Sequence, residues 1–130
     1  MAGTFKFELV TPERMALSQD AAQVVVPGVE GDFTVLAGHA PVISALRPGI
    51  IDVTLPDASK TRIFVKGGFA EVDAGHLTVL AERALDVEAM DAATIAAELE
   101  TAHADLAAAT DDAGRLAAAS AVERLRGLGR

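Results

Sequence analysis

Residues 27–49 read PGVEGDFTVLAGHAPVISALRPG, and they contain the most informative pattern in the chain. A short apolar run from Phe33 to Leu36 lies between turn-forming residues at Pro27-Gly28, at Gly38 to Pro41 and at Pro48-Gly49. Glycine and proline are the strongest local markers of turns between regular elements. The pattern therefore predicts a short strand with a sharp turn on either side of it.

The sequence leaves two interpretations of these turns open. In the first, the stretch is a plain meander in which His39 closes a turn. In the second, Glu30-Gly31-Asp32 lies beside Gly38-His39, and the two form a protruding pair of loops that serves as a docking edge. Loops held by a rigid scaffold often carry binding residues, so the second interpretation names a candidate site.

Further strands are predicted outward from this stretch in both directions. Phe5, Phe7 and Leu9 alternate with charged residues, which is the period-two pattern of a half-buried strand. More apolar runs follow as far as Leu80, and Asp73-Ala74-Gly75 separates the last two of them as a tight hairpin turn. Many short strands at close spacing indicate a β-sandwich or a barrel.

The composition changes near Asp86, and the rest of the chain is predicted to be helical. Residues 91–130 contain 14 alanines and no proline. Asp91 is suited to cap a first helix, and the break at Thr110-Asp111-Asp112 offers the cap of a second one. Two helices joined by a brief polar connection form an antiparallel hairpin. The expected apolar seams are Ile95, Leu99, Ala102, Leu106 and Ala109, and then Leu116, Ala119, Val122 and Leu125.

Charge and composition argue against several classes of function. The net charge is −8, with 11 basic and 19 acidic residues, so the clustered cations that bind nucleic acid or an anionic membrane are missing. Without Trp or Tyr, an aromatic site for sugars or peptides is hard to build. The first residues lack a signal-peptide run, and no apolar run approaches the roughly 20 residues of a membrane span.

Motifs for catalysis or for metal binding are also missing from the sequence. There is no cysteine, and His39, His76 and His103 show no metal-ligand spacing, so no metal site is expected. The glycines at 28–31 and at 67–68 lack the lysine of a phosphate-binding loop. Turns and bulges explain these glycines better. The sequence therefore predicts no active site.

The 27–49 stretch closely resembles the epsilon subunit family of bacterial F-type ATP synthases, whose mitochondrial counterpart is the delta subunit. The resemblance extends through residues 63–72, IFVKGGFAEV, and residues 77–82, LTVLAE, and it continues in layout into the tail. It implies a mainly β fold, with a ten-stranded β-sandwich over residues 1–86 and an antiparallel two-helix hairpin over residues 87–130. It also implies a non-catalytic subunit of the rotor stalk, without a cofactor, that couples rotation of the c ring to the catalytic head.

Partners and site residues follow from the same resemblance. The implied partners are the gamma subunit and the c-subunit ring, with the alpha and beta subunits reached by the hairpin. The chain would lie at the cytoplasmic side of the bacterial inner membrane and meet the membrane only through the complex. The implied ring-facing loop residues are Glu30, Gly31, Asp32, Gly38 and His39. The implied structural turns and packing residues are Pro27, Gly28, Pro41, Pro48, Gly49, Gly67, Gly68 and Phe69.

The tail departs from members of the family whose hairpin inhibits ATP hydrolysis through basic residues. Arg115, Arg124 and Arg126 are the candidate contacts, but residues 91–130 carry 4 basic and 7 acidic residues, so only weak inhibition is expected. Members that bind ATP have an arginine where this chain has Thr94, and no nucleotide is expected. A nucleotide-sensing regulator and an unrelated sandwich that binds sugars or peptides are the alternative hypotheses.

Overall fold

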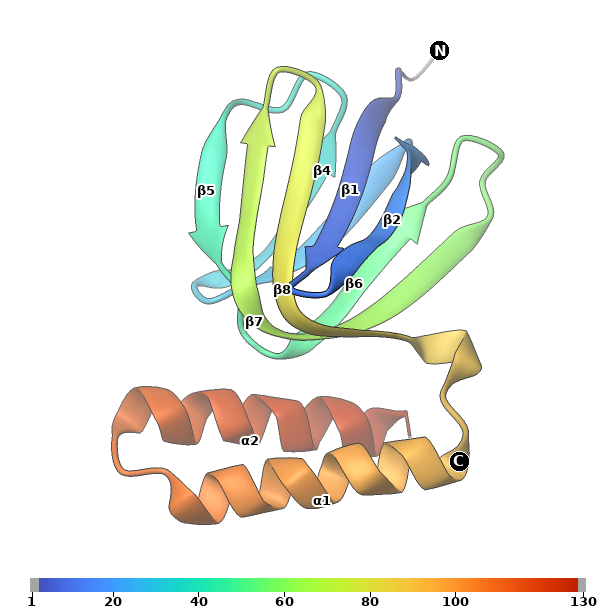
Figure 1. Cartoon of the computed structure of the whole chain (residues 1–130). Helices are drawn as coiled ribbons and strands as arrows, with labels where there is room; N and C mark the ends of the chain where they lie inside the picture. The colour runs from blue at the N-terminus through green and yellow to red at the C-terminus, as the bar shows by residue number, and fades with distance from the viewer. Residues whose placement is uncertain (1–2, 129–130) are drawn as a thin grey trace.

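The computed structural model describes residues 3–128, without the side chains of Arg14 and Ala16, so Gly129 and Arg130 of the tail lie outside it. A β-domain is followed by a short 3-10 helix and two α-helices that cross beneath it (Figure 1). The strands are β1 (Phe5–Thr11), β2 (Arg14–Ala21), β3 (Gln23–Gly28), β4 (Gly31–Leu36), β5 (Val42–Ala45), β6 (Gly49–Thr54), β7 (Lys60–Asp73) and β8 (His76–Asp86). The helices are η1 (Val87–Ala89), α1 (Ala92–Ala108) and α2 (Asp112–Gly127).

The strands form one continuous sheet that folds over into two layers. Their hydrogen-bonded order is β2-β1-β8-β7-β6-β3-β4, and β5 pairs with β7. The first half of β7 pairs with β6, and its second half pairs with β5. The predicted sandwich is therefore confirmed, but residues 3–128 form eight strands in place of the ten that the resemblance implied. The number is smaller because β7 and β8 each run through both layers as a single strand.

β7 bends between the layers at Gly67-Gly68. Both residues have a positive φ, +65° at Gly67 and +109° at Gly68. A Cβ atom on Gly68 would lie only 1.8 Å from the carbonyl oxygen of Leu80 on β8. Side chains rarely adopt such backbone angles, and here there is also no space for one. Glycine at this position is what allows the two long strands to stay paired through the bend.

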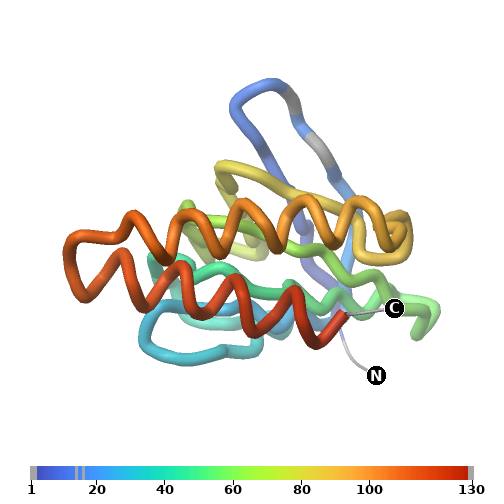
Figure 2. The backbone as a smooth tube through the Cα atoms, turned by 90° about the horizontal axis from the view of Figure 1, so that it is seen from below, coloured from blue at the N-terminus to red at the C-terminus, as the bar shows by residue number. Residues whose placement is uncertain are grey.

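Apolar side chains gather in two separate clusters. The sandwich cluster lies between the two layers and includes the fully buried Phe7. The hairpin cluster lies between the sheet and the helices, and Phe64 on β7 is its fully buried member from the sheet. The other buried members of the hairpin cluster are Val87, Met90, Ile95, Ala102, Ala121, Val122 and Leu125. Figure 2 shows the two helices side by side across the same end of the β-domain.

Both predicted helix caps are confirmed. The Asp91 carboxylate accepts a hydrogen bond of 2.8 Å from the backbone N–H of Thr94. The Asp111 carboxylate accepts one of 2.7 Å from the N–H of Gly114. These acceptors satisfy N–H groups that have no partner within the first turn of a helix.

The predicted seam is correct for α1 and wrong for the start of α2. Ile95 and Ala102 are buried, and the other members on α1 are half-buried. On α2, Val122 and Leu125 are buried, but Leu116 is 71% exposed and Ala119 is also exposed. The reason is that α2 packs against the sheet as well as against α1. Its buried face is consequently turned toward Ala118, Ala121, Val122 and Leu125.

Candidate docking surfaces

An apolar stripe crosses the outer face of the layer that contains β5, β7, β8, β1 and β2. Residues paired across neighbouring strands project from the same face of a sheet. Phe69, Leu80 and Met15 are 55%, 52% and 53% exposed, so this row faces away from the core. In register order across the strands, the outer stripe consists of Ala45, Phe69, Leu80, Val10 and Met15.

The margin of the outer stripe is acidic. Ile43, which precedes Ala45 by two residues on β5, is 69% exposed and widens the apolar surface at one end. Its row continues through Glu71 on β7 and Thr78 on β8 to Glu8 on β1. Contiguous exposed apolar residues with a polar rim are typical of interaction sites. This face can therefore take a partner surface that is apolar in the middle and basic beside it.

Phe69 has a different place from the one the resemblance implied. It was expected to be a packing residue, but its side chain is more than half exposed and belongs to the outer stripe. The neighbouring Ala70 is the buried one, because side chains alternate between the two faces along β7. The packing role of Phe69 is wrong, whereas Gly67 and Gly68 do form the bend described above.

The turn between β3 and β4 carries Glu30, Gly31 and Asp32, and Arg47 fixes its shape. The guanidinium group of Arg47 donates hydrogen bonds to the carbonyl oxygen of Gly28 and to the Asp32 carboxylate. The backbone N–H of Arg47 also donates to the carbonyl oxygen of Pro27 at 3.0 Å. Arg47 has no signal in the sequence, because nothing in the local pattern shows that residues 15 positions apart will pair.

Four of the predicted turn residues meet at this place. Gly28 forms an isolated bridge with Leu46, and a Cβ atom on Gly49 would lie 2.9 Å from the Cβ atom of Pro27. The carbonyl oxygen of Pro48 accepts a hydrogen bond of 2.8 Å from the Ser120 hydroxyl group on α2. The β3–β4 turn is thus joined to the hairpin through the segment before β6. Pro41 lies apart, in the loop that leads into β5.

The two loops expected to form one docking edge lie at opposite ends of β4. Glu30 precedes this strand and His39 follows it, and a strand of this length spans roughly 17 Å. The His39 ring leans back toward the Phe33 ring, with 6.4 Å between the ring centroids. Side chains of both loops line a groove between β4 and β5. The two loops are therefore separated along β4, although Glu30, Asp32 and His39 line the same groove.

A cleft of about 510 Å³ separates the β3–β4 turn from α2. Glu30 and Arg47 line it from the β-domain, and Leu116, Glu123 and Arg124 line it from the helix. Arg124 and Arg126, two of the candidate tail contacts, are exposed on α2. The third, Arg115, forms an ion pair with Asp112 one turn before it. A partner that touches the β3–β4 turn would also reach α2.

Within residues 3–128, no group of three or more His, Asp or Glu side chains is placed to hold a metal ion. Among these same residues, no helix has both the length and the apolar character that crossing a membrane requires. In the described part of the chain, the carboxyl groups of Asp91 and Asp57 have a lowered pKa. Hydrogen bonds from the Thr94 N–H to Asp91, and from the Ser59 hydroxyl group to Asp57, stabilise the ionised forms.

Comparison with known proteins agrees with this architecture. The family model described as ATP synthase, Delta/Epsilon chain, beta-sandwich domain matches residues 4–87. The chain therefore belongs to the delta/epsilon family of ATP synthase subunits.

Curated relatives of the chain are named ATP synthase epsilon chain. One from Parvibaculum lavamentivorans is 46% identical over 128 residues, covering 98% of this chain and 97% of the relative. One from Maricaulis maris is 48% identical over 124 residues, covering 95% of this chain and 92% of the relative. The resemblance to the epsilon subunit family that the sequence suggested is confirmed.

Two solved structures contain similar chains. A chain in the cryo-EM structure of the Euglena gracilis mitochondrial ATP synthase, OSCP/F1/c-ring in rotational state 1, has a TM-score of 0.74 and 28% identity. The match covers 96% of this chain and 79% of that one. A chain in the Tetrahymena thermophila mitochondrial ATP synthase central stalk and c-ring structure has a TM-score of 0.65 over 99% and 98% of the two chains, but 15% identity, and it shows the fold alone.

Proposed function

We propose that the chain is a non-catalytic rotor subunit that couples rotation of the c ring to the catalytic head through gamma. The outer stripe is the observation that carries this proposal. With adjacent strands about 4.8 Å apart, a row across β5, β7, β8, β1 and β2 is about 19 Å long and one residue wide. A surface of this shape matches one face of a helix over about 13 residues, which an elongated helical partner such as gamma would supply.

A pair of leucine variants tests this role of the outer stripe. Leu80 is 52% exposed on the outer stripe, and Leu36 is 51% exposed on β4, away from it. Burying a leucine contributes about 1.5–3 kcal/mol, so Leu80→Asp should weaken binding to purified gamma by about tenfold or more. Leu36→Asp should bind as the unaltered chain does. Equal affinities for the two variants in a calorimetric titration would show that gamma binds elsewhere.

The β3–β4 turn is the second part of the proposal, as the contact with polar loops of the c ring. Its exposed Glu30 and Asp32 suit adjustable contacts, because surface ion pairs contribute only about 0–1 kcal/mol each. The chain has no cysteine, so single introduced cysteines report position unambiguously. Glu30→Cys should cross-link to a cysteine in a c-subunit loop, and His39→Cys, at the other end of β4, should not. The reverse result would assign ring contact to the β4–β5 loop.

The hairpin is proposed to be a weak regulator of ATP hydrolysis that can meet the alpha and beta subunits through Arg124 and Arg126. Through these partners the chain would be peripheral, on the cytoplasmic side of the inner membrane. Removal of residues 91–130 should change ATP hydrolysis by the complex only slightly. A large increase in hydrolysis after this truncation would show strong inhibition and would contradict the proposal.

Binding of ATP by the hairpin is not part of this proposal. Lys66 and Arg83, the cations of the sheet that lie under α1, are already paired with carboxylates, and a phosphate group would have to displace them. Titration of the isolated chain with MgATP should release no heat of binding. A saturable heat signal would favour the nucleotide-sensing alternative.

A further inference from the structure

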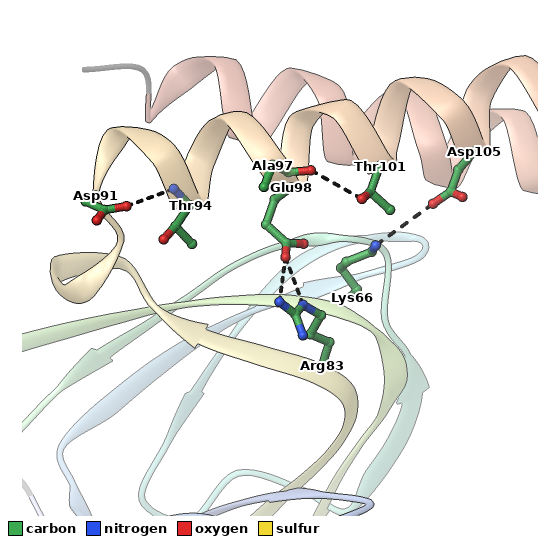
Figure 3. A network of polar contacts seen from close by, with 8 residues as sticks. All are labelled: Lys66, Arg83, Asp91, Thr94, Ala97, Glu98, Thr101 and Asp105. Atoms are coloured by element: carbon green, nitrogen blue, oxygen red, sulfur yellow. Dashed lines mark hydrogen bonds and ion pairs between the residues drawn. The ribbon is translucent and has the colours of Figure 1, made fainter.

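We propose that Lys66 and Arg83 form a receiving pair for α1 and that, by binding Glu98 and Asp105, they fix the position of the hairpin on the β-domain. These four residues meet at the boundary between the sheet and α1 (Figure 3). The proposal concerns the isolated chain, so it can be tested separately from any contact with gamma or the c ring.

The receiving pair creates a local repulsion between two positive charges in the sheet. Lys66 on β7 and Arg83 on β8 are register partners, so two positive side chains lie directly opposite each other on adjacent strands. Like charges in this arrangement destabilise a sheet. Carboxylates from another element can offset this repulsion, and α1 supplies them.

Glu98 is the stronger partner. Among the side chains that the structure describes, it is the only charged one in a buried residue, and its side chain is 10% exposed. Its carboxylate accepts hydrogen bonds from Nε of Arg83 at 3.0 Å and from Nη2 at 2.6 Å. Both bonds end on the same oxygen, Oε2, and hydrogen bonds between charged groups are stronger than neutral ones. A buried carboxylate without such a partner would be costly.

Asp105 repeats the arrangement two turns later. It lies seven residues after Glu98, on the same face of α1, and its carboxylate is 3.9 Å from Nζ of Lys66. Its side chain is 57% exposed, so this second pair contributes less. The buried Ile95 and Ala102 belong to the same face of the helix. The face therefore alternates apolar and acidic positions along its length.

This alternation determines the register of the helix. Alanine contacts are small and similar to one another, so an apolar face alone would tolerate sliding of α1 along the sheet. A shift of one turn would separate Glu98 from the guanidinium group of Arg83, and a buried carboxylate without its hydrogen-bonded cation is costly. The ion pair thus specifies one docked position and disfavours the others.

The two members of the main pair differ in exposure, and this predicts an asymmetry between variants. Arg83→Gln leaves a carboxylate buried without its cation. Glu98→Gln leaves a guanidinium group that is 52% exposed and can be hydrated. We expect Arg83→Gln to raise the undocked fraction of the hairpin by about tenfold or more and Glu98→Gln to raise it less. The double variant should return toward the docked state, because it has no unpaired buried charge.

Distances between spin labels in the full chain measure the docked fraction. Cysteines introduced at the exposed Asp73 and Ala107 place one label on the β-domain and one on α1. Glu100→Gln, an exposed acid on the same helix, is the matched control and should leave the distance distribution unchanged. Amide hydrogen exchange in β3 verifies in each variant that the β-domain stays folded.

Two results would overturn the proposal. One is a distance distribution for Arg83→Gln that equals that of Glu100→Gln. The other is a double variant that is less docked than Arg83→Gln. If Arg83→Gln loses the β-domain fold, the test is a double variant in which the two charges are exchanged, Arg83→Glu with Glu98→Arg. Recovery of the docked distance supports the proposal, and a persistently undocked hairpin refutes it.

Discussion

Replacement of Phe64 by alanine should detach the hairpin while the sandwich stays folded. Phe64 is fully buried, and it contacts the helices as a member of the hairpin cluster and not of the sandwich cluster. A buried Phe→Ala change costs about 3–5 kcal/mol. Full burial of each larger aliphatic member of the cluster contributes only about 1.5–3 kcal/mol. The free energy lost in Phe64→Ala is therefore a large part of the apolar stabilisation that holds the helices against the sheet.

Amide hydrogen exchange read by mass spectrometry measures this effect segment by segment. In Phe64→Ala, protection of α1 and α2 should fall by about 10²- to 10³-fold, the factor that 3–4 kcal/mol represents, while β3 keeps its protection. Phe7→Ala is the matched control, because Phe7 is equally buried but lies in the sandwich cluster. This control should lower protection in the strands. Equal loss of protection in β3 and in α1 after Phe64→Ala would show one cooperative unit and refute the reasoning.

Three further predictions concern single residues. Gly68→Ala should destabilise the chain far more than Gly75→Ala in urea titrations, because both have positive φ but a Cβ atom would clash only at Gly68; equal midpoints would contradict this. Hydrogen bonding lowers the pKa of Asp91 in the folded chain. The ionised Asp91 carboxylate therefore stabilises α1 at pH values above the pKa that Asp91 has in the unfolded chain. This stabilisation is lost as the pH falls through the pKa that Asp91 has in the folded chain. Asp91→Asn should reduce the acid-induced loss of helix seen by circular dichroism, and Asp57→Asn, which removes another lowered pKa on a distant turn, should not. Arg47→Gln should speed amide exchange in the β3–β4 turn about two- to fivefold, since partly exposed pairs are weak, and unchanged rates would show that the backbone alone holds the turn.

Local patterns predicted the elements whose causes are local. The caps at Asp91 and Asp111 were identified because an acceptor and the N–H groups it binds lie within three residues. The turn at residues 73–75 was identified for the same reason. By contrast, β2 and β5 were not assigned as strands. These edge strands pair with one neighbour each, and exposed Val42 and Ile43 give β5 no alternating pattern.

The candidate surfaces depend on contacts that are distant in sequence. Val10 and Leu80 of the outer stripe become neighbours only because β1 pairs in parallel with β8. No local periodicity in the sequence indicates that pairing. Glu98 occupies a buried position that a hydrophobic pattern assigns to apolar residues. Its partner Arg83 lies on a different element. Sequence reasoning finds such a charge only after the sheet order is known.

The continuity of β7 and β8 has a mechanical consequence. β7 carries Phe64 and Lys66 against the helices just before its bend, and it carries Phe69 on the outer stripe just after the bend. A force applied at the outer stripe and resisted at the hairpin is therefore carried along β7 itself. Because both surfaces include residues of the same strand, its covalent backbone bears this force, and hydrogen bonds between strands need not break. The outer stripe and the hairpin are accordingly linked through covalent bonds across Gly67-Gly68, and not only through side-chain contacts.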